Sequence, residues 1–135
     1  MLQELGLITR FDHIVLTVLD IQPSVDFYQR VLQMEARAFG ENRWALHFGQ
    51  QKINLQTLGM EKRNRAAVGS GDLCLITDWS MAQVIAHLHE QAVPILEGPV
   101  RRTGAKGPML SVYFVDPDQN LIEVSSYSAL DEAPP

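Results

Sequence analysis

Apolar and polar positions follow one another in short alternating runs, interrupted by stretches with helical spacing. Residues 11–18 form an apolar run rich in β-branched side chains, which predicts a strand covered on both faces. Residues 20–33 repeat apolar side chains at helical spacing, and Pro23 suits the first turn of a helix. Further strands are expected at residues 35–39, 43–48 and 52–57. The first half therefore predicts the order β-α-β-β-β.

The same order returns after a polar segment at residues 59–71. Residues 72–77 predict a strand, and residues 80–91 predict a helix with a capping-box pattern at its start. The remaining strands are expected at residues 94–97, 110–115 and 120–125. We interpret residues 98–108 as a long loop, and residues 131–135 as a frayed tail. The repeat predicts an α+β fold in which two βαβββ modules, at about 10–58 and 72–127, form one domain over residues 1–135.

Polar residues occupy equivalent positions in the two predicted modules. His13 lies on the first strand of one module and Asp72 on the first strand of the other. Asn54 and Glu123 lie on the last strands, each between apolar neighbours. Period-two alternation places Gln56 on the same face as Asn54. We therefore expect these side chains to converge on the interior of the domain.

A shared metal ion would explain this inward polar set. A buried carboxylate costs several kcal/mol unless it is paired or binds a metal. Imidazole and carboxylate ligands suit Zn²⁺, Ni²⁺, Mn²⁺ or Fe²⁺. Taken singly, His13 would be a hydrogen-bonded core residue, Glu123 a solvated strand end and Asp72 a turn residue. Their equivalent positions favour one divalent metal site, with Asn54 or Gln56 as an additional ligand.

Composition narrows the classes of function. The 135 residues are 46% hydrophobic and carry a formal net charge of -5, which gives no electrostatic footprint for nucleic acid or an anionic membrane surface. A single cysteine, Cys74, excludes an internal disulfide and is consistent with a reducing compartment. No apolar run approaches the ~20 residues of a membrane span. We expect a cytoplasmic protein, with export lacking a classical signal as the alternative.

Several further residues are candidates for substrate contacts. Trp44, Phe48 and Tyr113 would form walls of the pocket. Arg102 and Lys106 lie in the glycine-rich stretch, where they would clamp an anionic substrate or simply be solvated. Cys74 shares a strand face with Asp72, and we interpret it as a small core residue near the site.

Three segments resemble the glyoxalase/bleomycin-resistance/extradiol-dioxygenase (vicinal oxygen chelate) superfamily. They are Phe11-Asp-His-Ile-Val-Leu-Thr-Val18, Ser24-Val-Asp-Phe-Tyr28 and Tyr113-Phe-Val-Asp-Pro-Asp-Gln-Asn-Leu-Ile-Glu-Val124. The stretch at residues 98–108 looks like that of the virulence-associated, lactoylglutathione-lyase-like and glyoxalase-domain-containing proteins. The resemblance extends over nearly the whole chain and implies the same paired-module barrel.

The resemblance also implies a site and an activity. The family's metal positions fall on His13, Asn54, Asp72 and Glu123, although the family usually has His at position 72 and glyoxalase I has Glu at position 54. It implies a lactoylglutathione-lyase-type lyase or isomerase, with Glu123 or a metal-bound water moving a proton on a glutathione or other thiol adduct. An Fe²⁺-dependent extradiol dioxygenase and a non-catalytic binding or resistance protein are the alternatives. By the same resemblance, we expect a homodimer with its site near the interface.

Overall fold

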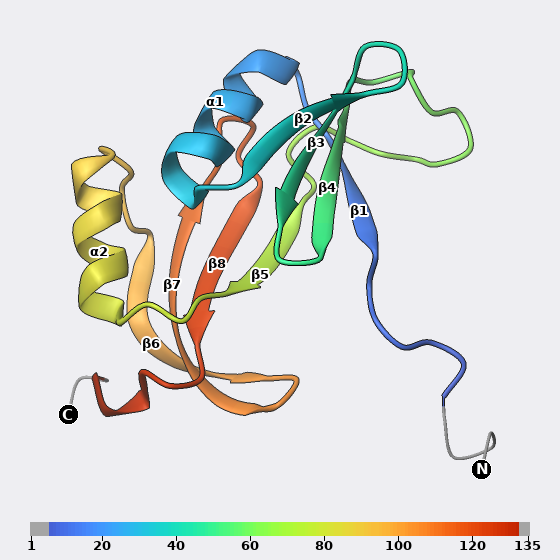
Figure 1. The fold of residues 1–135 in the computed structure, drawn as a ribbon. Coiled ribbons are helices and arrows are strands. Elements are labelled where there is room, and N and C mark those ends of the chain that lie inside the picture. Colours follow the sequence, from blue (N-terminus) through green and yellow to red (C-terminus); the bar gives the residue numbers. More distant parts are fainter. Residues whose placement is uncertain (1–5, 133–135) are drawn as a thin grey trace.

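Two four-stranded sheets, each accompanied by one helix, make up residues 6–132, the part of the chain that the computed structural model describes (Figure 1). The first module consists of β1 (His13–Thr17), α1 (Ile21–Leu32), β2 (Glu35–Phe39), β3 (Arg43–Phe48) and β4 (Gln51–Gln56). The second consists of β5 (Asp72–Ile76), α2 (Met81–Glu90), β6 (Glu97–Gly104), β7 (Gly107–Val115) and β8 (Leu121–Ser126). The predicted pair of βαβββ modules is therefore confirmed.

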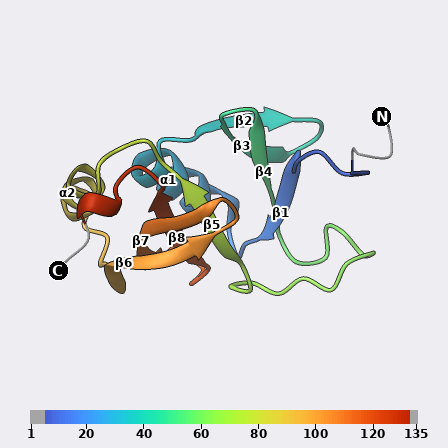
Figure 2. The same ribbon diagram turned by 90° about the horizontal axis from the view of Figure 1, so that it is seen from below.

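The two sheets have the same topology. Their strand orders are β1-β4-β3-β2 and β5-β8-β7-β6, and in each sheet the first strand pairs in parallel with the fourth. The other neighbours in both sheets are antiparallel. Figure 2 shows the sheets side by side, with α2 at the outer edge of the second module. The internal repeat seen in the sequence is thus a repeat of structure.

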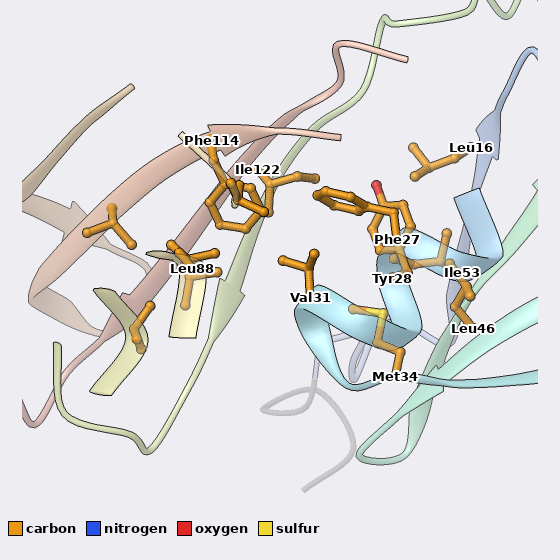
Figure 3. Packing of buried hydrophobic residues seen from close by; sticks show 14 of the residues in the cluster. Leu16, Phe27, Tyr28, Val31, Met34, Leu46, Ile53, Leu88, Phe114 and Ile122 are labelled. Atoms are coloured by element: carbon orange, nitrogen blue, oxygen red, sulfur yellow. The ribbon is translucent and has the colours of Figure 1, made fainter. Parts of the chain in front are cut away.

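One hydrophobic core joins the two modules, and α1 lies at their junction. Figure 3 shows Val31 and Phe27 of α1 between apolar side chains of the first sheet and of the second module. The Phe27 ring lies 6.4 Å from the Phe114 ring of β7, centroid to centroid. Fully burying a side chain of this size contributes about 1.5–3 kcal/mol. The helix face that covers the first sheet therefore also attaches the second module.

The start of α2 carries the predicted capping box. Ser80 Oγ accepts the Gln83 backbone N–H, and the Gln83 side chain accepts the Ser80 N–H. The carboxylate of Glu132, from a 3₁₀ turn at Leu130–Glu132, accepts the backbone N–H groups of Met81 and Ala82, the first two residues of the helix. The prediction of a frayed tail is therefore wrong for residues 131–132, while residues 133–135 lie outside the described part.

The predicted long loop at residues 98–108 is wrong, because most of it is strand β6 and the start of β7. Pro99 and the glycines made this stretch unlike a strand. β6 is an edge strand that pairs only with β7, and its register shifts between Glu97 and Val100. An edge strand with a bulge tolerates proline, because its outer side has no partner strand and a missing N–H there breaks no hydrogen bond of the sheet.

No helix in residues 6–132 is long and apolar enough to cross a membrane.

Candidate metal and substrate site

The first open face is the side of the first sheet that faces away from the helices, and it carries His13, Val15 and Asn54. β1 and β4 pair so that Val15 lies opposite Asn54, and His13 is two residues before Val15 on the same face. Ile14 and Leu16 point to the other side, into the core. Val15 is 45% exposed although it is apolar, so the part of the face around Val15 is uncovered in the single chain.

His13 is held by its neighbour Asp12. The Nδ1 atom of His13 donates to Asp12 Oδ2 at 2.8 Å, and this hydrogen bond lowers the pKa of the Asp12 carboxyl. A carboxylate behind Nδ1 orients the ring, so Nε2 is the nitrogen left to bind a ligand. The His13 side chain is 43% exposed, which leaves Nε2 accessible to a ligand. This arrangement is typical of a metal-binding histidine.

Asn54 carries a buried oxygen without a hydrogen-bond partner. Among residues 6–132, Asn54 Oδ1 is the one buried side-chain polar atom left unsatisfied. A buried unpaired carbonyl oxygen costs about 1–3 kcal/mol, so a partner that the chain itself does not supply is expected. Gln56 differs, since its Nε2 donates to Thr17 Oγ1 at 2.9 Å within the protein. Between these two amides, Asn54 is the better candidate for an additional metal ligand.

The second open face is the corresponding side of the second sheet, and it carries Asp72, Cys74 and Glu123. β5 and β8 pair so that Cys74 lies opposite Glu123, and Asp72 is two residues before Cys74. Asp72 therefore has the same position relative to Glu123 in the second sheet as His13 has relative to Asn54 in the first sheet. Ile76, farther along the same face, is 55% exposed, so this part of the face is uncovered too.

A chain of hydroxyl groups lies beside Glu123. Ser125 Oγ donates to Glu123 Oε2 at 3.2 Å and lies 2.6 Å from Ser111 Oγ. Cys74 Sγ is 3.3 Å from Ser125 Oγ and exposed, so its interpretation as a core residue is wrong. The thiol is still partly shielded from water, and this partial burial and the carboxylates of Glu123 and Asp72 raise the pKa of Cys74. At neutral pH Cys74 is therefore a thiol and a weak nucleophile.

The single chain brings only part of the predicted metal set together. His13 and Asp72 line one cavity of about 260 Å³ between the modules, and Glu123 is not among its lining residues. Within residues 6–132, no group of three or more His, Cys, Asp and Glu side chains lies close enough to hold a metal ion. Each open face thus presents half of the set.

The predicted substrate residues divide between the two sides of the sheets. Tyr113 pairs with Glu123 across the second open face, and Arg102 Nε donates to Tyr113 Oη at 2.8 Å. Arg102 also forms an ion pair with Glu97 at 3.2 Å. Lys106 lies in the β6–β7 turn, away from this cluster, where its backbone N–H donates to Tyr127 Oη.

Trp44 and Phe48 lie on the helix side of the first sheet and pack against the core, opposite to Asn54. Phe48 still reaches the cavity that His13 and Asp72 line, whereas Trp44 is not among its lining residues.

Sequence reasoning missed three residues of the first open face. Phe39, Arg43 and Lys52 lie there, and Arg43 and Phe39 line a cavity of about 450 Å³ together with His13 and Asn54. The guanidinium of Arg43 lies 5.2 Å from the centre of the Phe39 ring, and Lys52 Nζ lies 4.2 Å from it. The alternation that places Gln56 with Asn54 also places Lys52 there, so a signal for Lys52 existed.

Close relatives share most of the length of this chain. A virulence protein of Salmonella typhimurium, STM3117, is 48% identical over 124 residues, covering 90% of this chain and 86% of the relative. The glyoxalase domain-containing protein RDO1 of Mycosarcoma maydis is 50% identical, covering 86% of this chain and 67% of its own. The metallothiol transferase FosB of Staphylococcus epidermidis is 30% identical, covering 92% and 86%.

Solved structures give the same relationship. An integron cassette protein from the mobile metagenome of V. cholerae is 53% identical with a TM-score of 0.87, covering 92% of this chain and 99% of that one. A lactoylglutathione lyase from Agrobacterium tumefaciens is 20% identical with a TM-score of 0.71, covering 88% and 94%, and it shares the fold. The family match itself extends over residues 10–124. The chain therefore belongs to the Glyoxalase/Bleomycin resistance protein/Dioxygenase superfamily.

Proposed function

We propose that this protein is a metal-dependent enzyme whose divalent ion is held by His13, Asp72 and Glu123, with Asn54 Oδ1 as an additional ligand. The observation that carries the proposal is the buried, unsatisfied Asn54 Oδ1 on the same face as His13, whose Nδ1 is already held by Asp12. Nitrogen and oxygen donors of this kind fit Zn²⁺, Ni²⁺, Mn²⁺ or Fe²⁺. The name of the FosB relative describes a metallothiol transferase, which agrees with metal chemistry on this fold.

A second copy of the chain would complete the site. The first open face carries three cations, Arg37, Arg43 and Lys52, against the carboxylate of Glu35. The second carries three carboxylates, Asp72, Glu97 and Glu123, against the cation of Arg102. Surfaces of opposite charge attract each other, and the exposed Val15 and Ile76 give both faces an apolar part to bury. In a symmetric dimer, the first open face of each copy would meet the second open face of its partner. This arrangement supports a metal site shared between His13 of one copy and Glu123 of the other.

The chain's own residues account for substrate orientation and proton transfer. Ser125 holds Glu123 Oε2, so the other carboxylate oxygen is available to take and return a proton. Arg102 Nε donates to Tyr113 Oη and so holds this phenol on the face that carries Glu123, where its hydroxyl would donate to a substrate oxygen. When bound, a divalent ion polarises adjacent substrate oxygens and stabilises the negative charge that develops on them. This set suits a lyase or isomerase acting on a thiol adduct of a 2-oxoaldehyde.

Turnover of the hemithioacetal formed from methylglyoxal and glutathione tests the proposal. Protein loaded in turn with each of the four metals is expected to form the thioester, and Glu123→Gln is expected to lower kcat about 100-fold or more. His89→Ala, a change at an exposed helix position, is the matched control and should leave kcat unchanged. Oxygen uptake with catechol under Fe²⁺, without thioester formation, would instead assign a dioxygenase. Tight binding of an aromatic ligand by a protein that retains no metal would assign a binding protein.

A further inference from the structure

A pocket of about 290 Å³ lies on the helix side of the second sheet, where the two modules meet. Its walls come from the end of α1, from α2 and from Leu75 and Val124 of the second sheet. These two residues lie opposite each other, and each directly follows a residue of the second open face, Cys74 or Glu123. Because successive side chains of a strand point to opposite sides, the sheet separates this pocket from Glu123.

The pocket has a buried floor and an exposed rim. Val31 of α1 and Leu88 of α2, which Figure 3 labels, belong to the floor and are each 2% exposed. Val84, one turn before Leu88, is buried beside them. Ile76 and Trp79 form the rim, and they are 55% and 39% exposed. A ligand in the pocket would remove this apolar rim from water, which favours binding.

The aromatic side of the pocket is held in place by the protein itself. His87 Nε2 donates to the Val31 carbonyl oxygen at 2.7 Å, which joins α2 to the end of α1. The Trp79 ring stands edge-on to the His87 ring, with the ring centres 5.6 Å apart and an angle of 81° between the planes. The Trp79 backbone N–H donates to Thr77 Oγ1 at 3.1 Å. A wall that is already formed lowers the entropy cost of binding a ligand.

The lining selects an uncharged ligand. No Asp, Glu, Lys or Arg side chain of residues 6–132 lines the pocket, and its polar side chains are Gln33, Thr77 and His87. A charged molecule would lose its hydration here without an ion pair in return. An engineered apolar cavity of about 150 Å³ binds benzene, so the larger pocket suits one ring or two fused rings. Trp79 and Phe48 supply aromatic contacts for such a ligand.

We propose that this pocket binds a neutral aromatic molecule of one or two rings, at a site separate from the proposed metal ligands. None of the four proposed metal ligands lines the pocket, so the proposal goes beyond the proposed function. Phe48 and Leu75 also line the cavity of His13 and Asp72, and they form the wall between the two cavities. The ligand would contact α1 of the first module and α2 of the second, and would therefore stabilise their junction.

Naphthol, which is uncharged at neutral pH, and naphthalenesulfonate, an anion with the same rings, are the probes, added to full-length protein. Naphthol is expected to bind saturably in equilibrium dialysis, and naphthalenesulfonate at least about tenfold more weakly. In an NMR titration, naphthol should shift the indole N–H signal of Trp79. The indole signal of Trp44, which does not line the pocket, should stay in place.

Two substitutions test the location. Trp79→Ala removes part of the rim and should weaken naphthol binding about tenfold. Val84→Phe fills the floor and should abolish binding. Leu19→Ala is the matched control, because Leu19 is 77% exposed and lies outside the pocket, and it should change affinity less than about twofold. If circular dichroism shows that Val84→Phe does not fold, Trp79→Ala decides the test.

The outcomes separate this site from the proposed metal site. Naphthol binding by Glu123→Gln protein that has lost its metal, with the affinity of wild type, would support the proposal. Loss of naphthol binding in Glu123→Gln would place the naphthol at the metal face and overturn it. Equal binding of naphthol by wild type and Trp79→Ala, or equal binding of the two probes, would also overturn it. So would a change from dimer to monomer in Trp79→Ala, since a second copy would then occupy the pocket.

Discussion

The hydroxyl of Tyr28, on α1 of the first module, donates a 2.6 Å hydrogen bond to Asp116 Oδ2 of the second module, 88 residues away. Both residues are buried. Asp116 also accepts the side-chain amide of Asn120 and the backbone N–H groups of Asp118 and Asn120. The Asp-Pro-Asp-Gln-Asn turn is therefore more than a hairpin connection, because it attaches the second module to α1. Asp118 extends this contact by accepting the Leu19 N–H and the Ser24 hydroxyl.

Tyr28→Phe is expected to destabilise the protein by about 1.5–3 kcal/mol, since the change removes a donor to a buried carboxylate. Urea denaturation followed by circular dichroism measures this loss. Tyr127→Phe is the control, because Tyr127 accepts an exposed backbone N–H, and it should cost less than about 1 kcal/mol. Equal effects of the two substitutions would mean that the Tyr28 contact does not join the modules.

Alkaline pH should weaken the fold through the same residue. Burial and the Asp116 carboxylate raise the pKa of Tyr28. Above about pH 10 the unfolded chain loses the tyrosine proton while the folded chain keeps it, so stability present below this pH is lost as pH rises. The free energy of unfolding, measured between pH 9 and 11, should fall less steeply in Tyr28→Phe than in wild type. The same slope in both proteins would contradict this assignment.

Residue pattern alone predicts the fold but not how the modules meet. The repeat, the capping box at Ser80 and the equivalence of His13 with Asp72 follow from local periodicity, and the strand registers confirm them. The strand predicted at residues 94–97 was placed too early: β6 is Glu97–Gly104, because proline and glycine weaken the strand pattern of residues 98–104 and only the pairing with β7 makes them a strand. The distance between the two open faces depends on contacts such as Phe27 with Phe114, which join distant parts of the chain. No local pattern encodes that distance.

The Glu132 carboxylate should contribute to the stability of α2. It accepts the Met81 and Ala82 N–H groups at a helix start, where negative charge is favourable. Glu132→Gln is expected to lower the free energy of unfolding by about 0.5–1 kcal/mol. Thermal denaturation checks this, with the exposed Asp131→Asn as the matched control. No difference between the two variants would exclude the cap.

A site shared between two copies predicts complementation. Mixed and re-formed dimers of His13→Ala and Glu123→Ala chains should recover roughly a quarter of wild-type activity, because half the dimers are mixed and each mixed dimer has one intact site. Each variant alone should be inactive. The absence of recovery, with mixed dimers demonstrated by mass spectrometry, would place His13 and Glu123 of one site in the same chain.

The central claim is that residues from both modules bind one metal ion. Elemental analysis of protein purified without added metal tests it most directly, on wild type and on the His13→Ala, Glu123→Ala and His89→Ala variants. We expect one divalent ion per chain in wild type and in His89→Ala, and less than about a tenth of that in the other two. Full metal content in either His13→Ala or Glu123→Ala would contradict the assignment.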